Sequence, residues 1–451
     1  MLKLLHITAH LGGGVGKVLA QVVAESRQRE PEVQHTIVCL DALEKSQFAD
    51  RVTSSGGTLL LCPTKLELDA HIRSADIVQL EWWHHPVVAG WMCSGELPPM
   101  RLLIWSHVSG LHSPEIPTAF VAAPHRFLFT SPCSLEHRAM AAVKTTVGER
   151  AGVVFSSGGF DEFPPAPARI HKGPLRVGYV GTLNFAKLHP RILDFVAAVR
   201  QPDFRLAFIG DPTTGKDLLE NAALRELGGQ LELRGYHTDL AKQLERLDVL
   251  AYLLNPLHYG TTENALLEAM AMGVVPIVLN NPAERYLVKH MESGLVVDNP
   301  ETFADALDWL TNHPDECARL SRNAARTARA SFSIGGTVDN LRTHYKAILS
   351  DQKRCFDFRP IFGPEPADWF RSCQGGEVWR FSNEEAPRNL SGRGPSFLYE
   401  RTKSSVFHYR AVYPADARLA RWAQQLDAGP CMPTLPNEDA SHAAIGMGTS
   451  Q

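Results

Sequence analysis

Two successive series of short apolar runs constrain the fold of this chain most strongly. The first series is LKLLHITA (2–9), TIVCL (36–40), IVQL (77–80), LLIWS (102–106), FLFT (127–130) and GVVF (152–155). The second is LRVGYV (175–180), RLAFI (205–209), LELR (231–234), VLAYL (249–253) and VPIVL (275–279). Apolar runs of strand length separated by helix-length segments indicate parallel sheets that helices cover on both faces.

A proline-rich break separates the two series. Residues 161–174 contain four prolines and charges of both signs without periodicity, which is typical of a linker. The sequence therefore predicts an α/β chain with two doubly wound, Rossmann-like domains at 1–165 and 166–350. The carboxyl ends of their strands are expected to face each other across a cleft.

The remainder of the chain differs in composition. A helical stretch at 300–349 is expected to close the second domain. Residues 351–430, rich in Phe, Trp and Tyr, are interpreted as an appended module with some strand content at 405–413. Residues 431–451, rich in Pro, Ser and Gly, are expected to be a disordered tail.

Charge and cysteine usage exclude several classes of function. The 45 basic and 49 acidic residues give a net charge of −4, which argues against nucleic acid as the main partner. None of the eight cysteines forms a CxxC pair, and no His, Asp or Glu set has metal-ligand spacing. The start of the chain lacks the apolar core of a signal peptide, and no run approaches the roughly 18 apolar residues of a membrane helix. We expect a cytoplasmic protein, with peripheral membrane contact left open.

A glycine-rich turn follows the first expected strand. GGGVGK (12–17) does not match the phosphate-binding P-loop, because Leu11 and Val18 stand where that motif needs glycine and Ser or Thr. It does not match GxGxxG either, because Lys17 holds the third glycine position. Such a turn before a helix still lets a ligand approach the backbone closely, although a tight turn without a ligand remains an alternative.

Two further segments contain candidates for anion and sugar binding. In GTLNFAKLH (181–189), Lys187 follows a strand at the expected start of the next helix and is placed there to pair with a diphosphate, unless it is an ordinary solvated lysine. In TTENALLEAMAMG (261–273), Thr261 and Thr262 are suited to cap a helix over 263–272, whose N-terminus favours an anion. Glu268, inside that helix, is suited to accept two hydrogen bonds from a ribose diol.

The order of these segments resembles family 4 glycosyltransferases of the GT-B fold (glycosyl transferases group 1) over about residues 2–349. LGGGVGKVL resembles their N-terminal glycine loop, WSHVSG (105–110) their strand-end histidine, and LLEAMAMGVVPIV their ribose-binding segment. The resemblance implies a retaining transfer of a sugar from a UDP or GDP sugar, without metal or cofactor. The first domain is then the acceptor side and the second the nucleotide-sugar side.

The resemblance also implies roles for individual residues. His107 and Lys187 are the catalytic candidates. The donor-binding candidates are Gly13, Gly14, Thr182, Lys187, Thr261, Thr262, Glu263, Asn264 and Glu268. The acceptor, a glycan, lipid or small molecule, is expected to contact Gly12, Trp83 and His84; packing at a domain edge is the alternative for the last two.

The chain departs from the family pattern at two positions. Gly260 stands where the family has a glutamate, and Thr182 stands where it has a diphosphate-binding arginine. These departures leave open a non-catalytic GT-B domain that binds a nucleotide or glycan and recruits a protein partner through residues 352–425. A GT-B epimerase or phosphorylase is a further alternative, although no motif for either is present.

Overall fold

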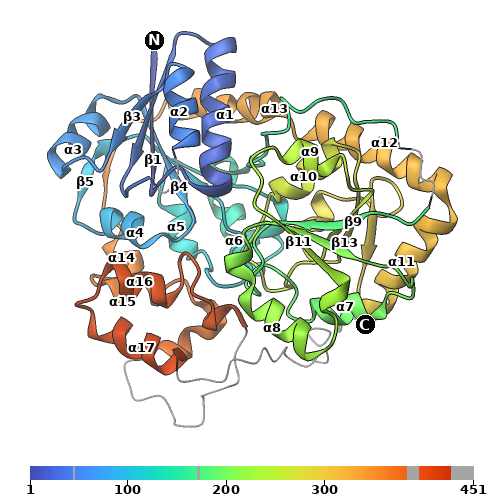
Figure 1. Cartoon of the computed structure of the whole chain (residues 1–451). Coiled ribbons are helices and arrows are strands. Elements are labelled where there is room, and N and C mark those ends of the chain that lie inside the picture. Colours follow the sequence, from blue (N-terminus) through green and yellow to red (C-terminus); the bar gives the residue numbers. More distant parts are fainter. Residues whose placement is uncertain (44–45, 170–172, 383–395, 428–451) are drawn as a thin grey trace, which may run out of the picture.

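The computed structural model describes residues 1–43, 46–169, 173–382 and 396–427. Two α/β domains lie side by side, and a smaller helical module covers one end of the first domain (Figure 1). The expected tail at 431–451 lies outside the described residues. The predicted fold class, two doubly wound domains with an appendage, is confirmed.

The first domain is built on a seven-stranded sheet in the order β3-β2-β1-β4-β6-β7-β8, and all its neighbouring strands pair in parallel. Its strands are β1 (Leu2–Thr8), β2 (Val33–Cys39), β3 (Thr58–Leu61), β4 (Ile77–Trp82), β6 (Leu102–Ser106), β7 (Arg126–Phe129) and β8 (Ala151–Val153). Its helices are α1 (Gly13–Arg29), α2 (Gln47–Ser54), α3 (Lys65–Ser74), α4 (Pro86–Met92), α5 (Thr118–Ala122) and α6 (Arg138–Val147). Every residue of β4 and β6 is buried, as expected for central parallel strands covered on both faces.

The second domain has a six-stranded sheet in the order β11-β10-β9-β12-β13-β14, again parallel throughout. Its strands are β9 (Val177–Val180), β10 (Leu206–Ile209), β11 (Leu231–Gly235), β12 (Val249–Tyr252), β13 (Val275–Leu279) and β14 (Leu295–Val297). Its helices are α7 (Ile192–Ala198), α8 (Lys216–Leu224), α9 (Leu240–Leu244), α10 (Asn264–Ala271), α11 (Pro300–Asn312) and α12 (Pro314–Ser331). The predicted strands in both series are therefore present, with ends shifted by a few residues.

Helix α13 (Ile334–Ile348) returns to the first domain. The sequence assigns this stretch to the second domain, but its apolar side packs in one cluster with Leu4, Val18 and Trp105 of the first. The Tyr345 hydroxyl donates to the side chain of Gln79 on β4. The chain therefore crosses between the domains twice, once after β8 and once before α13.

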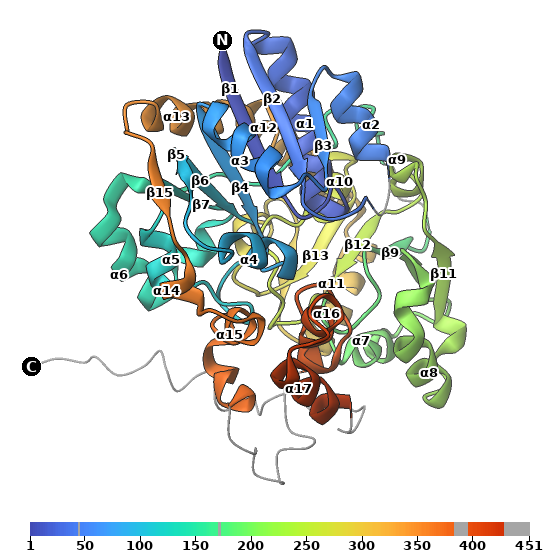
Figure 2. The same ribbon diagram turned by 90° about the vertical axis from the view of Figure 1, so that its left-hand side faces the viewer.

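The appended module packs onto the first domain and shares its core. Strand β15 (Arg354–Phe356) pairs antiparallel with β5 (Leu97–Met100) of the first domain. The module's helices are α14 (Arg359–Phe362), α15 (Pro366–Arg371), α16 (Val406–Val412) and α17 (Ala417–Asp427), with short 3-10 turns at Gly375–Phe381 and Ser396–Tyr399. Figure 2 shows α15, α16 and α17 gathered below α4, and the module's aromatic side chains join a single cluster with those of β4 and α5.

The strand content expected at 405–413 is wrong, because this segment forms α16. The Ser405 hydroxyl accepts from the backbone N–H of His408, which is an N-cap bond. Val406, Phe407 and Tyr409 are buried on one side of the helix. Capping and one-sided burial outweigh the strand propensity of this aromatic run.

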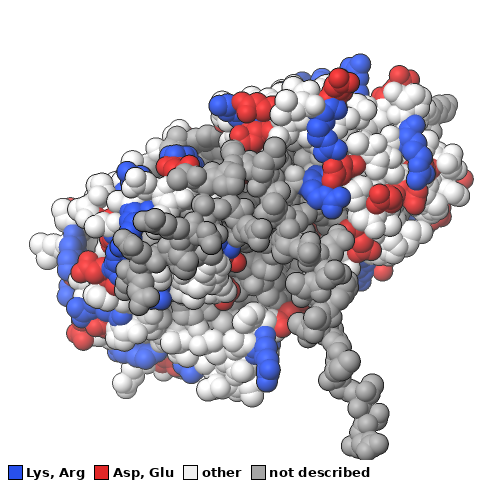
Figure 3. Space-filling view, turned by 90° about the horizontal axis from the view of Figure 1, so that it is seen from below, with Lys and Arg blue, Asp and Glu red and all other residues white. Residues whose placement is uncertain are grey.

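The exposed surface shows no large patch of one charge where described residues form the face seen in Figure 3. Basic and acidic side chains are interspersed there, consistent with the balanced composition. None of the helices within the described ranges is long and apolar enough to cross a membrane.

Candidate functional site

A cavity of about 580 Å³ lies between the second domain and the appended module. On the second domain it is lined by Thr182, Asn184, Ala186, Lys187, His258, Tyr259, Gly260 and Glu263. On the module it is lined by Arg401, Thr402, Lys403, Phe407, His408 and Ala411. The second-domain wall follows the carboxyl ends of β9 and β12, which is the edge of a doubly wound sheet where ligands bind.

Lys187 and Glu263 form an ion pair on the second-domain wall. The Lys187 Nζ is 2.9 Å from the Glu263 carboxylate, which also accepts from the Tyr252 hydroxyl at 2.6 Å. Burial opposes the charged form of Glu263, but the charges of Lys187 and His258 and the hydrogen bonds from Tyr252 and Lys187 together outweigh it and lower the pKa of Glu263 to about 2. Burial also disfavours the charged form of Lys187, and the charge of Glu263 raises its pKa in turn. Both groups are therefore ionised at neutral pH, and Lys187 is a fixed cation in the cavity wall.

Gly260 makes room for the Glu263 carboxylate. A Cβ added at Gly260 would lie 1.9 Å from Oε1 of Glu263 and 2.8 Å from Nδ1 of His258. The backbone N–H of Gly260 donates to that same histidine nitrogen at 3.0 Å. Gly260, which departs from the family pattern, thus leaves space for the carboxylate of Glu263, three residues further along the chain.

Glu268 is paired with a lysine from the other domain. It is buried on α10, and its carboxylate is hydrogen-bonded to Nζ of Lys17 on α1. Gly159, at a φ of +94°, lies so close to Lys17 that a Cβ would be 2.3 Å from its Cε. Burial raises the pKa of Glu268, and Lys17 acts against this rise. The candidate ribose-binding carboxylate therefore has a competing cationic partner in this closed arrangement.

Thr261 and Thr262 do not cap α10. The N-cap position is Glu263, which makes no side-chain capping bond. The Thr261 hydroxyl lies 2.7 Å from that of Thr130 in the first domain, and the Thr262 hydroxyl donates to the Thr130 carbonyl at 2.7 Å. The expected capping role is therefore replaced by contacts across the domain interface.

The glycine turn faces the start of α10. Gly12 is the N-cap of α1, and Gly13 has a φ of +61°, a conformation that favours glycine. A Cβ on Gly14 would lie 3.8 Å from the Asn264 amide nitrogen, which itself donates to the Ser156 carbonyl. The structure therefore brings Gly13, Gly14 and Asn264 to the interdomain contact rather than to the lining of the large cavity.

Thr182 lies at the exposed mouth of the cavity. Its carbonyl accepts from the Tyr179 hydroxyl at 2.9 Å, which fixes the loop after β9. Lys187 lies in the following turn rather than at the start of a helix, since α7 begins only at Ile192. Among the donor-binding candidates, Thr182, Lys187 and Glu263 line the cavity.

His107 belongs to a buried polar chain. Its Nε2 is 2.7 Å from Glu81, whose other oxygen accepts from the Gln79 amide and lies 3.6 Å from Nδ1 of His6. Burial opposes ionisation of Glu81, but the bond to His107 and the proximity of His6 lower its pKa overall. His107 is thus held by a carboxylate behind it at the end of β6 and does not line the large cavity.

The acceptor-side candidates lie in different environments. His84 is completely buried, its Nε2 is 3.1 Å from the Trp369 carbonyl, and its ring stacks with that of Phe370. It anchors the module and does not face the cleft. Trp83 is half-buried beside His107, with ring centroids 6.5 Å apart. The backbone N–H of Gly12 donates to the His10 ring, and that ring contacts the ring of Trp83.

Three residues of the interface were missed from the sequence. Arg401 and Lys403 line the cavity from a segment with no recognised motif, and Lys17 belongs to a glycine-rich pattern that indicates no role for its side chain. Basic residues shortly before Ser405 do not by themselves indicate a binding site. Only the return of the chain onto the first domain places them opposite Lys187.

Comparisons with known proteins agree with this architecture. Residues 161–327 match the family model described as Glycosyl transferases group 1. A curated protein of Bacillus subtilis, "Putative glycosyltransferase YtcC", is 30% identical over 92 residues. That alignment covers 20% of this chain and 23% of the length of the relative.

Solved structures share the two-domain fold at low sequence identity. A glycosyltransferase from Rickettsia africae has a TM-score of 0.60 and 13% identity, covering 78% of this chain and 99% of that one. HepE of Anabaena in complex with UDP-glucose has a TM-score of 0.60 and 14% identity, covering 77% and 100%. Sucrose-phosphate synthase from Thermosynechococcus elongatus has a TM-score of 0.59 and 14% identity, covering 78% and 100%. These structures confirm the GT-B fold, and each leaves about a fifth of the present chain without a counterpart.

Proposed function

We propose that this chain, with its GT-B fold and a second domain that matches group 1 glycosyl transferases, transfers a sugar from a nucleoside-diphosphate sugar to an acceptor hydroxyl. UDP and GDP sugars are the donors to test first, since HepE is solved with UDP and with UDP-glucose. Retention of the anomeric configuration and independence from metal belong to the proposal through the family resemblance.

The observation that carries the proposal is the ion pair in the cavity wall. Lys187 and Glu263 lie together at the carboxyl ends of the strands, directly before the N-terminus of α10. A lysine cation and the positive end of a helix both stabilise an anion at this point. The Glu263 carboxylate, which contacts Tyr252 and Lys187, is placed to orient Lys187 and to accept from a sugar hydroxyl.

The chemical step needs charge stabilisation at the leaving group. The bond between the anomeric carbon and the diphosphate oxygen breaks, and its electron pair stays on the diphosphate. The acceptor oxygen forms the new bond to that carbon, and its proton passes to the departing phosphate oxygen. Lys187 stabilises the negative charge that develops, and electrostatic stabilisation of this kind commonly lowers the barrier more than any other single effect.

Nucleotide binding requires a rearrangement at Glu268. A ribose diol and the Lys17 ammonium need the same buried carboxylate. In the proposed cycle, the donor enters when the two domains separate enough to release Lys17. Reclosure then excludes water from the reacting centre and disfavours hydrolysis of the donor.

A non-catalytic nucleotide-binding protein is the second candidate. Two observations favour it. Thr182 supplies no positive charge at the cavity mouth, where the family has an arginine, and Lys17 pairs with the Glu268 carboxylate. Such a protein would bind nucleotide without turning over a sugar donor.

Calorimetric titration with UDP and GDP, followed by an assay of donor hydrolysis and transfer, tests these functions. Binding together with turnover supports the enzyme, whereas binding without any turnover supports the second candidate. If neither nucleotide binds at millimolar concentration, the assignment of the donor site is wrong. Glu268→Ala is expected to weaken nucleotide binding by about 1–3 kcal/mol through loss of its hydrogen bonds. The exposed Glu292→Ala is the matched control.

A further inference from the structure

We infer that the appended module is part of the donor site, and that Arg401 and Lys403 bind the diphosphate from the side opposite Lys187. This inference rests on the proposed function, because it assigns two further contacts to the same donor. It assigns to residues 396–427 a role in substrate binding rather than recruitment of a partner.

The segment with these cations is fixed to both domains. The Glu400 carboxylate accepts from the backbone N–H of Phe185 in the second domain at 2.9 Å. The Ser404 hydroxyl donates to the Trp83 carbonyl in the first domain at 2.9 Å. Residues 400–404 therefore form a strap across the cleft, and they hold Arg401 and Lys403 at the cavity wall between two anchored points.

The charge of the cavity fits a diphosphate. Its lining contains the cations Lys187, Arg401 and Lys403 and one carboxylate, Glu263, which pairs with Lys187. The module therefore adds two positively charged side chains to this cavity, of which Arg401 pairs with the exposed Asp427 outside the lining. A diphosphate bound between Lys187 and the strap would be contacted from two sides, which a single lysine cannot do.

Arg401 is held near the cavity by contacts that a ligand can replace. Its guanidinium is 2.7 Å from Asp427 and lies over the Phe407 ring at 4.9 Å from the centroid. Both partners of the ion pair are exposed, at 70% and 42%, and exposed pairs contribute little to stability. Turning from Asp427 to a phosphate therefore costs little, and Phe407 keeps the side chain at the cavity edge.

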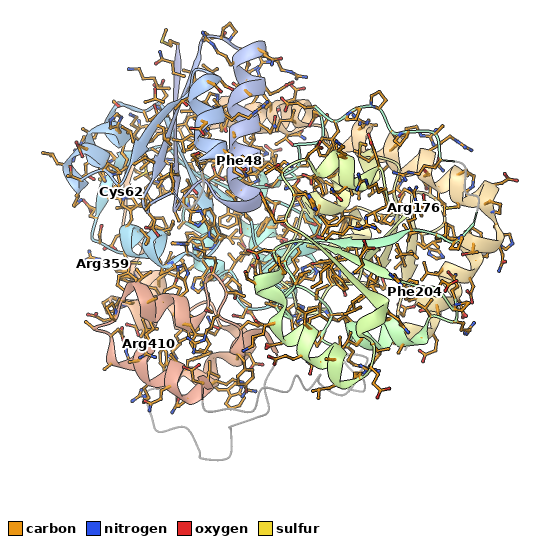
Figure 4. All side chains as sticks on the ribbon, viewed as in Figure 1. Phe48, Cys62, Arg176, Phe204, Arg359 and Arg410 are labelled. Carbon is orange, nitrogen blue, oxygen red and sulfur yellow. The ribbon has the colours of Figure 1, made fainter. Side chains whose placement is uncertain are left out.

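The experiment compares nucleotide binding by the full chain and its variants. Arg401→Gln with Lys403→Gln is expected to weaken UDP or GDP binding at least about tenfold, since hydrogen bonds to charged groups contribute about 1.5–3 kcal/mol. The monophosphate of the same nucleoside should lose much less. Arg401→Lys should retain most of the affinity because it keeps the charge. Arg410, labelled on α16 in Figure 4, is exposed and does not line the cavity, so Arg410→Gln is the matched control.

Salt dependence gives a second readout that a structural role would not change. Affinity of the wild type should fall more steeply with salt than that of the double variant, because fewer charges act in the variant. Equal diphosphate affinity and equal salt dependence in the two proteins would overturn the inference while leaving the donor site intact. A wild-type protein that binds no nucleoside diphosphate would overturn the proposed function as well.

Discussion

Lys17 and Glu268 form an ion pair that joins the two domains at the position where a donor ribose is expected. Lys17 lies just past the first turn of α1, after the glycine loop, and Glu268 is buried inside α10. The contact stabilises the closed arrangement and at the same time occupies the carboxylate that the nucleotide needs. Stability and donor binding are therefore coupled through one side chain.

Replacing Lys17 should reveal this coupling. Lys17→Met leaves the Glu268 carboxylate buried without its cation and is expected to lower the free energy of unfolding by about 1–3 kcal/mol. Adding Glu268→Gln to Lys17→Met should recover part of the loss, because the uncompensated charge is removed. Urea denaturation measures both effects. Lys289→Met, which breaks an exposed pair with Glu292, is the control and should change stability by less than about 0.5 kcal/mol. A loss with Lys17→Met no larger than this control would contradict the assignment.

Gly260→Ala should disturb the cavity wall strongly. The new methyl group cannot coexist with the Glu263 carboxylate 1.9 Å away, so the Lys187–Glu263 pair must break or move. We expect a loss of about 1–3 kcal/mol in stability together with weaker donor binding. Gly228→Ala is the control, since a Cβ there meets no atom within 4 Å.

The double variant Gly260→Glu, Glu263→Ala tests whether a carboxylate supplied by residue 260 can replace the one that residue 263 supplies. It should bind donor better than Gly260→Glu alone, because the space between residues 260 and 263 then holds one carboxylate instead of two. If the double variant binds no better than that single variant, the two positions are not interchangeable.

The ion pair at Glu263 predicts a specific acid sensitivity. The pKa of Glu263 is lower in the folded protein than in the unfolded chain, so the unfolded chain takes up its proton first as the pH falls. This stabilisation is complete above about pH 5 and is lost between about pH 5 and pH 2. Glu263→Gln should be less stable than wild type by about 2–3 kcal/mol at pH 7, and the difference should shrink as the pH falls through this window. A difference that is constant from pH 7 to pH 4 would contradict the prediction; urea unfolding at several pH values measures it.

His84→Ala tests whether this histidine anchors the module. The side chain is fully buried and contacts Trp369, Phe370 and Tyr409, so its removal leaves a cavity between the module and β4. We expect a loss of about 2–4 kcal/mol and faster proteolysis within residues 351–427. The exposed His237→Ala is the control. Unchanged stability with impaired transfer alone would favour the acceptor-side role instead.

Most strands of the two sheets could be predicted because each of them is a short apolar run that can be recognised from its own residues. Runs such as residues 102–106 and 275–279 are continuously apolar, and both are fully buried strands in the structure. Strand β3, at Thr58–Leu61, was missed because it is only half-buried at the sheet edge. Strands β5 and β15 were missed because their pairing joins residues about 250 positions apart, and LPPM at β5 has two prolines that argue against a strand.

The functional residues of the site could be predicted only where a single segment of the sequence shows both the residue type and its place beside a strand or helix. Lys187 follows a strand, Glu263 precedes a helix and Glu268 lies inside that helix, all in recognisable positions, and the first two do line the cavity. The threonines before α10 have the composition of caps, yet their hydroxyl groups contact another domain. Arg401 and Lys403 gave no signal because their placement depends on the docking of the module.

The double crossing between the domains has a mechanical consequence. The Phe155 and Phe332 rings, one on each crossing, have centroids 5.1 Å apart, and the backbone N–H of Ile334 donates to Asp161. Two adjacent covalent connections leave the domains one easy motion, a rotation about the line on which the connections lie. Helix α13 starts at this line near the top of Figure 1, whereas the module lies at the bottom. The strap at residues 400–404 is therefore far from the rotation axis, so a small rotation moves its two ends apart by a large distance. One or two hydrogen bonds there resist a small angle of opening effectively. Opening of the cleft therefore requires Glu400 to release Phe185 as well as Lys17 to release Glu268.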